Sequence, residues 1–460
     1  MTSSLINKYN VPGPRYTSYP TVPYWNNDSF SLKVWKETLC DSFRKSCNTS
    51  GKNKDGGISL YIHLPFCESM CTFCGCTKRI TKNHTVERPY IHALLKELEL
   101  YRQLLGKRPV IGQLHFGGGT PTFFSPQNLK ALLEGIFKIA DRSEPCEFSF
   151  EGHPNNTTRE HLDVLHTFGF TRVCYGVQDY NATVQKAINR IQPFENVKTA
   201  TENARAAGYS SVGHDVIFGL PFQTLGHVRH TITKTIELRP ERIAFYSYAH
   251  VPWIKGNGQR GYRSEDLPTA EEKRRQYEVG KQMLHVAGYV EIGMDHFALQ
   301  GDDLHTAQVE KKIHRNFMGY TASKTQVMIG LGVSAISDSW YSFAQNVKGL
   351  AEYYHLLDND ILPIYRGHIL NTEDLTIRKH ILNLMCHFKT SWEDRADQFA
   401  ELPETLIKLK ELEIDGLITF GPKSVTVTEQ GKPFVRNVCL PFDLRLKRNR
   451  PGTKVFSMTI

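Results

Sequence analysis

The chain has 460 residues, 40% of them hydrophobic and 22% charged, which is ordinary for a globular protein with enough core for two domains. Its formal net charge is +9, but the basic residues are dispersed, whereas a nucleic-acid-binding protein usually carries a dense basic stripe with interleaved aromatic residues. No apolar run reaches the roughly 18 to 20 residues that cross a bilayer, and the N-terminus lacks the apolar core of a signal peptide. We therefore expect no nucleic-acid partner, no membrane contact and a cytoplasmic location.

Residues 1–50 are predicted to form an extended N-terminal arm. The stretch from Pro12 to Pro20 is punctuated by proline and cannot be helical. Because this arm is rich in tyrosine for a disordered segment, we expect it to pack on the body of the protein.

Residues 51–365 are predicted to form one domain in which strands alternate with helices. A strand-like run begins at Ile58, and five similar runs follow, separated by helical patterns. The helices are predicted at 87–106, 126–140, 158–168, 181–190, 194–207, 224–238 and 269–288. This succession is typical of a parallel sheet with helices outside it. About six strand–helix units, instead of eight, predict an α/β fold built on an incomplete (β/α)6-type barrel, open at one side.

The tail is predicted to form a second, smaller unit. Leu362 to Gly367 has the composition of a linker. Residues 366–460 then show helical patterns at 373–388 and 403–414, followed by a hairpin-like pair of strands. We expect a small, mostly helical, winged-helix-like domain.

Four cysteines fall within ten residues after the first predicted strand: Cys67, Cys71, Cys74 and Cys76, spaced C-x3-C-x2-C-x-C. Thiolates on one short loop can converge on a soft metal centre. Structural zinc sites usually take two well-separated ligand pairs, and no second pair follows, so an iron–sulfur cluster is favoured. Three of these cysteines can hold three irons of a four-iron cluster and leave the fourth iron open to a substrate or cofactor.

Polar residues and glycines fall where the later predicted strands end. Gly117–Thr120 follows the second strand, Glu151 the third, Gln178 the fourth, Asp215 the fifth and Ala249 the sixth. In βα barrels the carboxyl ends of the strands carry the active site. One face of the barrel is therefore expected to gather these residues with the cysteines.

The cysteine spacing resembles that of radical S-adenosylmethionine (SAM) enzymes. The leading Tyr61-x-His63-x-Pro65 and the added Gly75-Cys76 narrow the likeness to the oxygen-independent coproporphyrinogen III oxidases, or dehydrogenases, of anaerobic haem synthesis. Segments far from the cysteines extend the resemblance to nearly the whole chain. They are Asn316–Thr321, Gly330–Ser337 and Val455–Ile460.

The resemblance implies a set of cofactors and the residues that hold them. One [4Fe-4S] cluster would be held by Cys67, Cys71 and Cys74, with Cys76 nearby and not a cluster ligand. Tyr61 and His63 would both be needed for activity. Two SAM molecules are expected, and the residues expected to form the SAM site are Tyr61, Phe73, Cys76, Gly118, Gly119, Thr120, Glu151, Gln178, Arg190, Asp215, Ala249 and Ile336.

The resemblance also implies a reaction. An electron from the cluster would cleave SAM to methionine and a 5′-deoxyadenosyl radical, which takes a hydrogen atom from a propionate of coproporphyrinogen III. Loss of a second electron and of carbon dioxide would leave a vinyl group, and a second round would give protoporphyrinogen IX. The partners expected are this substrate, an electron donor such as flavodoxin or ferredoxin, and an electron acceptor that the sequence does not identify. The chain is expected to be a monomer.

Three alternatives stay open at this level: a haem chaperone on the same scaffold, a radical SAM methyltransferase and a zinc-ribbon binding protein. The Gly75-Cys76 pair and the Asn316–Tyr320 segment favour the oxidase over the chaperone. Two positions depart from the family pattern. Met318 stands where other members often carry glutamine, at a place associated with a second SAM, and His153 replaces the usual acidic residue two positions after Glu151.

Overall fold

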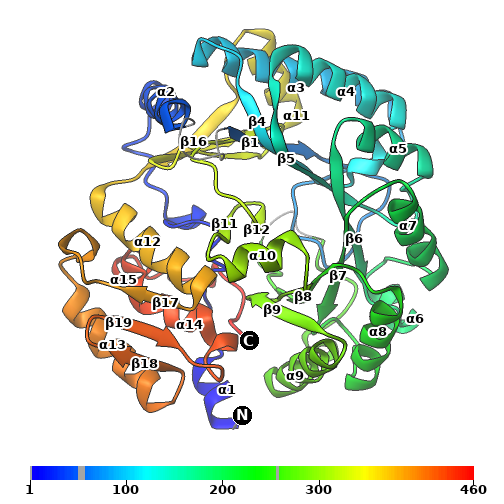
Figure 1. Ribbon diagram of the computed structural model, residues 1–460. Coiled ribbons are helices and arrows are strands. Elements are labelled where there is room, and N and C mark those ends of the chain that lie inside the picture. The colour runs from blue at the N-terminus through cyan, green and yellow to red at the C-terminus, as the bar shows by residue number, and fades with distance from the viewer. Residues whose placement is uncertain (1–2, 50–56, 255–257) are drawn as a thin grey trace.

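The computed structural model describes residues 3–49, 57–254 and 258–460. Within these ranges, one twelve-stranded sheet curves into an open ring, with most of the helices on its outer side (Figure 1). The order of its strands is β16-β15-β14-β13-β1-β4-β5-β6-β7-β8-β10-β9. No helix in the described part of the chain is both long and apolar enough to cross a bilayer.

Six parallel strands form the middle of this sheet, each hydrogen-bonded to the next along the chain. They are β1 (Ile58–Leu64), β4 (Val110–Gly118), β5 (Asp141–Gly152), β6 (Phe170–Gln178), β7 (Ser211–Phe218) and β8 (Arg242–Ser247). The helices between and after them are α3 (Glu87–Leu105), α4 (Pro126–Ile139), α5 (Arg159–Thr167), α6 (Ala182–Ala187), α7 (Phe194–Ala206), α8 (Leu225–Leu238) and α9 (Ala270–Val286). The predicted six strand–helix units are confirmed.

Antiparallel strands extend the sheet at both edges. Next to β1 lies the parallel strand β13 (Met328–Leu331), and the antiparallel strands β14 (Ile336–Asp338), β15 (Ser342–Asn346) and β16 (Ile364–Ile369) follow it. Next to β8 lie β10 (His296–Leu299) and β9 (Tyr289–Gly293). The edge strands β16 and β9 do not pair with each other among the described residues, so the barrel is incomplete, as predicted.

The prediction of a linker at Leu362 to Gly367 was wrong. Its second half belongs to β16, which pairs with β15 and continues to Ile369. The predicted boundary between residues 365 and 366 therefore falls within a strand of the large sheet, and the boundary between 50 and 51 lies outside the described residues. The predicted division into three parts stays a prediction.

A short hairpin lies within the ring of strands (Figure 1). It consists of β11 (His314–Asn316) and β12 (Gly319–Thr321), and helix α10 (Asp303–Val309) precedes it. Two small strands bracket the cysteine run: β2 (Phe66–Cys67) pairs in parallel with β3 (Arg79–Ile80). Helix α11 (Leu350–Asp358) packs beside α3 on the outer side of the sheet.

The N-terminal arm packs against the C-terminal region. It carries two helices, α1 (Ser3–Tyr9) and α2 (Leu32–Thr49), neither of which the sequence predicted. Pro12 forms a β-bridge with Met458, and Arg436 donates hydrogen bonds to the carbonyls of Gly13 and Pro14. The C-terminal elements are α12 (Thr372–His387), β17 (Lys389–Ser391), α13 (Leu402–Ile414), β18 (Ile418–Gly421), β19 (Ser424–Val427), α14 (Val435–Cys439) and α15 (Leu444–Arg448).

Local sequence explains why the strands and helices alternate here. In α3, Leu94, Leu98 and Tyr101 recur at helical spacing and are fully buried, so that face covers the sheet. The helix ends at Gly106, whose φ of 72° is a left-handed conformation that glycine adopts without strain. Helix α4 begins after Ser125, whose hydroxyl accepts a hydrogen bond from the backbone N–H of Asn128.

Candidate functional site

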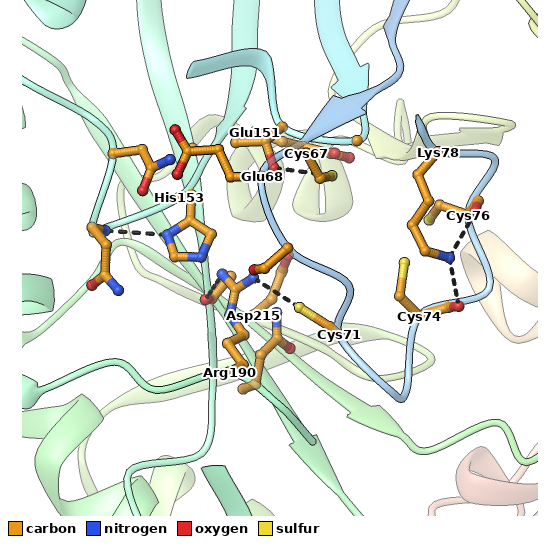
Figure 2. Close-up of a pocket in the computed structure, with 18 of the residues that line it drawn as sticks. Cys67, Glu68, Cys71, Cys74, Cys76, Lys78, Glu151, His153, Arg190 and Asp215 are labelled. Carbon is orange, nitrogen blue, oxygen red and sulfur yellow. Dashed lines mark hydrogen bonds between the residues drawn. The ribbon is translucent and has the colours of Figure 1, made fainter. Parts of the chain in front are cut away.

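A cavity of about 340 Å³ lies at the carboxyl ends of the central parallel strands. It is lined by most of the residues that the sequence predicted for the site (Figure 2). These are Cys67, Cys71, Phe73, Cys74, Cys76, Gly118, Gly119, Thr120, Glu151, Gln178, Arg190 and Asp215. The parallel strands gather them, because their carboxyl ends meet at the same edge of the sheet.

Backbone contacts hold the cysteine loop over this edge. The N–H of Thr72 donates to the carbonyl of Ile188 at 2.9 Å, and its hydroxyl donates to the carbonyl of Ala187 at 2.8 Å. The side-chain amide of Asn189 donates to the carbonyl of Met70 at 2.8 Å. The turn after α6 therefore anchors the loop between its second and third cysteines.

The cysteine side chains have different surroundings. Burial raises the pKa of Cys67 to about 11, and its sulfur lies 3.4 Å from the hydroxyl of Thr120. A hydrogen bond from Cys76 lowers the pKa of Cys74. The ammonium of Lys78 donates to the carbonyl of Cys74 at 3.1 Å and faces the Cys74–Cys76 pair (Figure 2). Positive charge and a thiol donor both favour a thiolate at Cys74.

The glycine segment after β4 lies directly against the start of the cysteine loop. The N–H of Gly119 donates to the carbonyl of Leu64 at 2.8 Å. A Cβ atom on Gly119 would lie 2.6 Å from the carbonyl carbon and oxygen of Pro65, so only glycine allows this approach. The next N–H, from Thr120, donates to the carbonyl of Phe66 at 3.0 Å.

Two of the predicted polar residues, Glu151 on β5 and Asp215 on β7, line the cavity on either side of β6. Glu151 accepts a hydrogen bond from the N–H of Gly118 at 3.3 Å, and its side chain is about half exposed. Asp215 accepts one from the thiol of Cys174 at 3.2 Å. Burial raises the pKa of Asp215 to about 7, so this carboxyl group is poised to take up a cationic or hydroxyl-bearing ligand.

Arg190 and Gln178 complete the same wall. Arg190 donates to the carbonyl of Gly176 at 2.6 Å and reaches toward the sulfur of Cys71 at 3.7 Å (Figure 2). Its Nε is buried without a partner among the described residues, which leaves a donor for a ligand carboxylate. Gln178 ends β6 with a φ of 67°, a conformation that is strained for a residue with a side chain and that is common at binding sites.

Tyr61 and His63 lie behind the cavity wall and do not line it. The phenol of Tyr61 is 3.1 Å from Nδ1 of His63, and Nε2 of His63 is 2.9 Å from the carbonyl of Thr77. The hydroxyl of Tyr90 donates to the carbonyl of His63 at 2.8 Å. These contacts fix the two side chains beneath the glycine segment.

The structure does not bring Ala249 and Ile336 to this cavity. The carbonyl of Ala249 accepts a hydrogen bond from Gln259 at 2.8 Å, and Ile336 packs with Trp25 and Phe343 beyond the edge of the parallel strands. Their predicted contacts with SAM stay predictions.

Several cavity residues were missed by sequence reasoning. Cys174 was not predicted for the site, although it alternates with Gly176 and Gln178 along β6 and lines the cavity with them. Lys78 and His153 also line the cavity. Burial lowers the pKa of His153 to about 3, so its imidazole is neutral and forms an uncharged part of the cavity wall.

Comparison with known proteins supports the resemblance to radical SAM enzymes. The family model for the Radical SAM superfamily matches residues 61–234. A protein of Synechocystis (strain PCC 6803) named oxygen-independent coproporphyrinogen III oxidase is 37% identical to this chain, and the match covers 100% of this chain and 98% of the relative. A protein of the same name from Helicobacter pylori strain 26695 is 38% identical, and the match covers 99% of this chain and 98% of the relative.

The fold is matched by a solved structure as well. The coproporphyrinogen III oxidase of Escherichia coli, described as a radical SAM enzyme, superposes on this chain with a TM-score of 0.86 at 34% sequence identity. The superposition covers 96% of this chain and 98% of that one.

Proposed function

The chain belongs to the oxygen-independent coproporphyrinogen III oxidase family of the radical SAM superfamily, and from this membership we propose how its residues share the work. The enzyme acts in haem biosynthesis. It oxidatively decarboxylates two propionates of coproporphyrinogen III to vinyl groups and so yields protoporphyrinogen IX, with SAM consumed to methionine and 5′-deoxyadenosine. The single observation that supports the residue roles below is the gathering of three cysteines and the polar residues Glu151, Gln178, Arg190 and Asp215 around one cavity.

The donor set fits a [4Fe-4S] cluster. A cuboidal cluster bonds each cysteine to a different iron, so its thiolates surround a volume instead of meeting at one point. Cys67, Cys71 and Cys74 border one cavity in this way, and among the described residues no three His, Cys, Asp or Glu side chains are close enough to share a single metal ion. We propose these three as the cluster ligands. Cys76 is then free to donate its hydrogen bond to Cys74.

The chemistry of the cavity also fits SAM. When bound, the cluster and SAM supply the one-electron chemistry that removes a hydrogen atom from the substrate. Arg190 offers its unpartnered Nε to the methionine carboxylate, and the backbone of Gly118 and Gly119 receives the amino group. Asp215 and Gln178 bind the ribose hydroxyls, and Glu151 lies near the amino group of SAM. The buried pair Tyr61 and His63 supports the glycine segment from below, 3.1 Å apart.

We propose that two SAM molecules bind to the enzyme. This proposal rests on the resemblance, because the second cavity inside the barrel, lined by Met318, His115 and Arg172, measures only about 20 Å³, the room of about one water molecule. Equilibrium dialysis with labelled SAM tests this: about two molecules bound per chain would support it, and one would contradict it.

The remaining partners are proposed on the resemblance alone. A flavodoxin or ferredoxin supplies the electrons, and the acceptor of the substrate electron is unknown. The enzyme is proposed to be a cytoplasmic monomer with an N-terminal arm (1–50), a catalytic barrel (51–365) and a C-terminal domain (366–460). The haem-chaperone and methyltransferase alternatives are not favoured, because relatives matched over nearly the full length carry the oxidase name.

One experiment tests the assignment directly. The reconstituted protein is incubated without oxygen with SAM, a low-potential reductant and coproporphyrinogen III, and the products are read by mass spectrometry. Stepwise loss of two carboxyl groups, absent in a Cys71→Ser variant, is expected. Cleavage of SAM without decarboxylation of the substrate would contradict it.

A further inference from the structure

Inside the barrel, one buried arginine has no carboxylate partner among the described residues. Arg315, on β11, is 5% exposed, and its Nε and Nη1 have no hydrogen-bond partner in the part of the chain that the structure describes. Within the described ranges, its side chain donates one hydrogen bond, from Nη2 to the backbone carbonyl of Arg15 at 3.3 Å. The guanidinium also lies 4.5 Å from the ring centroid of Tyr320. A buried charge without a counter-charge is costly, which indicates that a ligand completes this environment.

The surroundings of Arg315 carry an excess of positive charge. Arg15 is paired with Asp295 at 3.2 Å and donates to the carbonyl of Ser247 at 2.9 Å. Arg436 donates only to neutral carbonyls of the arm and the tail. Burial and the nearby charge of Arg15 lower the pKa of Arg436 to about 9. Three guanidinium groups therefore surround Asp295, while the nearby Glu291 is paired with Lys281 at 2.6 Å, and the excess of positive charge favours an anionic ligand.

This basic group adjoins the proposed SAM site. On β8, Ala244 pairs with Asp215 of β7, and Tyr246 lies two residues further along, so Asp215 and Tyr246 project from the same face of the sheet. The guanidinium of Arg15 lies 5.7 Å from the ring centroid of Tyr246. Burial and the charge of Asp215 raise the pKa of Tyr246, whereas the charges of Arg315 and Arg15 lower it. Tyr246 thus separates the basic group from the residue proposed to bind the SAM ribose.

We propose that Arg315, assisted by Arg15, binds one propionate carboxylate of the tetrapyrrole substrate. This inference rests on the proposed function, since coproporphyrinogen III carries four such carboxylates. The free N–H groups on Nε and Nη1 point to opposite sides of the Arg315 guanidinium. A carboxylate that takes two hydrogen bonds therefore uses one of them together with the second N–H of Nη2, whose other N–H donates to the carbonyl of Arg15. The same logic applies to Arg190, whose free Nε is proposed for the carboxylate of SAM. A bound water would satisfy the donors of Arg315 but would leave its charge uncompensated.

The carboxylate has two sources in the substrate: a propionate that the reaction converts to vinyl, or one that remains in the product. Coproporphyrin III and protoporphyrin IX, the stable oxidised forms of substrate and product, separate them. If the site holds a retained propionate, loss of Arg315 weakens the binding of both porphyrins. If it holds a converted propionate, only coproporphyrin III binds more weakly.

The test compares Arg315→Met and Arg315→Lys with wild type, all reconstituted with the cluster. Arg229→Gln, on the outer helix α8, is the matched control for the loss of one positive charge. For Arg315→Met we expect the Kd for coproporphyrin III, and the KM for coproporphyrinogen III, to rise about 10- to 100-fold, the usual worth of one charge-assisted hydrogen-bonded group. Arg315→Lys keeps the charge without the fork, and should recover part of the affinity.

Thermal stability distinguishes ligand binding from a structural role. A charge reserved for a ligand destabilises the free protein, so the Tm of Arg315→Met should equal or exceed that of wild type, with SAM affinity unchanged. Unchanged porphyrin affinity and KM would overturn the inference, and so would a fall in Tm accompanied by loss of SAM binding. If wild type itself fails to decarboxylate the substrate, the proposed function fails first. If wild type decarboxylates the substrate and Arg315→Met shows unchanged porphyrin affinity and KM, the proposed function stands and only the inference about Arg315 fails.

Discussion

The phenolic oxygen of Tyr61 lies 3.1 Å from Nδ1 of His63, and the opposite ring nitrogen of His63 lies 2.9 Å from the carbonyl of Thr77. A carbonyl only accepts, so Nε2 of the histidine carries the proton and Nδ1 accepts from the tyrosine. Burial lowers the pKa of His63, which keeps the ring neutral and this arrangement fixed near pH 7. The ring lies against Gly118, where an added Cβ would come within 2.7 Å of Nδ1.

Replacing Tyr61 by phenylalanine should therefore damage the SAM site without removing the cluster. The change leaves Nδ1 of His63 buried without a donor, at a cost of about 1–3 kcal/mol, and loosens the support beneath Gly118. We expect SAM cleavage to fall about 10- to 100-fold, while the iron content per chain stays at the wild-type level. Tyr365→Phe, an exposed tyrosine on β16, serves as the control. Wild-type cleavage by Tyr61→Phe would contradict the supporting role.

The affinity for SAM should depend on pH through Asp215. Burial raises the pKa of this carboxyl to about 7, and the ribose hydroxyls and sulfonium of SAM favour its ionised form. The ionised fraction falls about tenfold between pH 8 and pH 6, so the affinity should fall by the same factor over this range. Calorimetric titration of wild type and Asp215→Asn across this range checks the effect. The variant should bind more weakly with no such slope, and a flat wild-type profile would rule out Asp215 as the titrating ligand.

Most of the barrel was predictable from the sequence, whereas its edges were not. Helical segments follow the central strands, so the apolar residues change from a period of two in a strand to one of about 3.6 in a helix. This change placed α3 and α8 within a residue of their bounds. The edge strands β13 to β16 are three to six residues long. Runs this short carry too few alternations to separate a strand from a loop, and so Ile364 to Gly367, the first four residues of β16, were taken for part of a linker.

The site was predictable where residues follow strand ends in a recognisable order. The cysteines and the glycine segment satisfy that condition, and they meet in the cavity. Cys174 does not satisfy it, because this residue lies within β6 and not at its end. Whether its side chain reaches the cavity depends on which face of the strand points into the barrel. Arg315 was missed for a different reason: its missing partner is a property of the folded interior, and no sequence pattern signals it.

Gly119→Ala should disrupt the contact between the glycine segment and the cysteine loop. The added Cβ would lie 2.6 Å from backbone atoms of Pro65, which cannot move aside as a side chain can. We expect a lower Tm and weaker binding of SAM, measured by differential scanning calorimetry and by dialysis. Gly112→Ala, within β4, is the matched control, since its added Cβ would meet nothing closer than 3.6 Å. Equal behaviour of the two variants would show that close approach is not what requires glycine at 119.

Glu97 should make the stability of the protein depend on pH. This buried side chain accepts hydrogen bonds from the N–H of Gly332 at 2.9 Å and from Asn346 at 2.6 Å, and burial raises its pKa to about 7. Between pH 4.5 and 7 the folded state keeps the proton that the unfolded state loses. The contribution of Glu97 to the stability is therefore greatest below pH 4.5 and is lost as the pH rises toward and through 7, by up to about 3 kcal/mol.

Urea unfolding of wild type and Glu97→Gln at several pH values between 5 and 8 isolates this contribution. The wild type should lose stability relative to the variant as the pH rises toward 7, and the difference should then level off. A wild type that gains stability relative to the variant over the same range would show that Glu97 is ionised in the folded protein.

The last prediction separates the ligand cysteines from Cys76. Cys71→Ser should lose most of its iron, because two thiolates and a hydroxyl hold the cluster poorly, while Cys146→Ser, far from the loop, keeps it. Cys76→Ala should also keep about four irons per chain, since three other thiols remain. Its effect should fall on the redox potential instead: the thiol of Cys76 lowers the pKa of Cys74 by donating to it, and a donor to a ligand thiolate stabilises the electron-rich, reduced cluster. A redox titration followed by electron paramagnetic resonance should therefore give a more negative midpoint potential for Cys76→Ala, and loss of iron equal to that of Cys71→Ser would instead make Cys76 a cluster ligand.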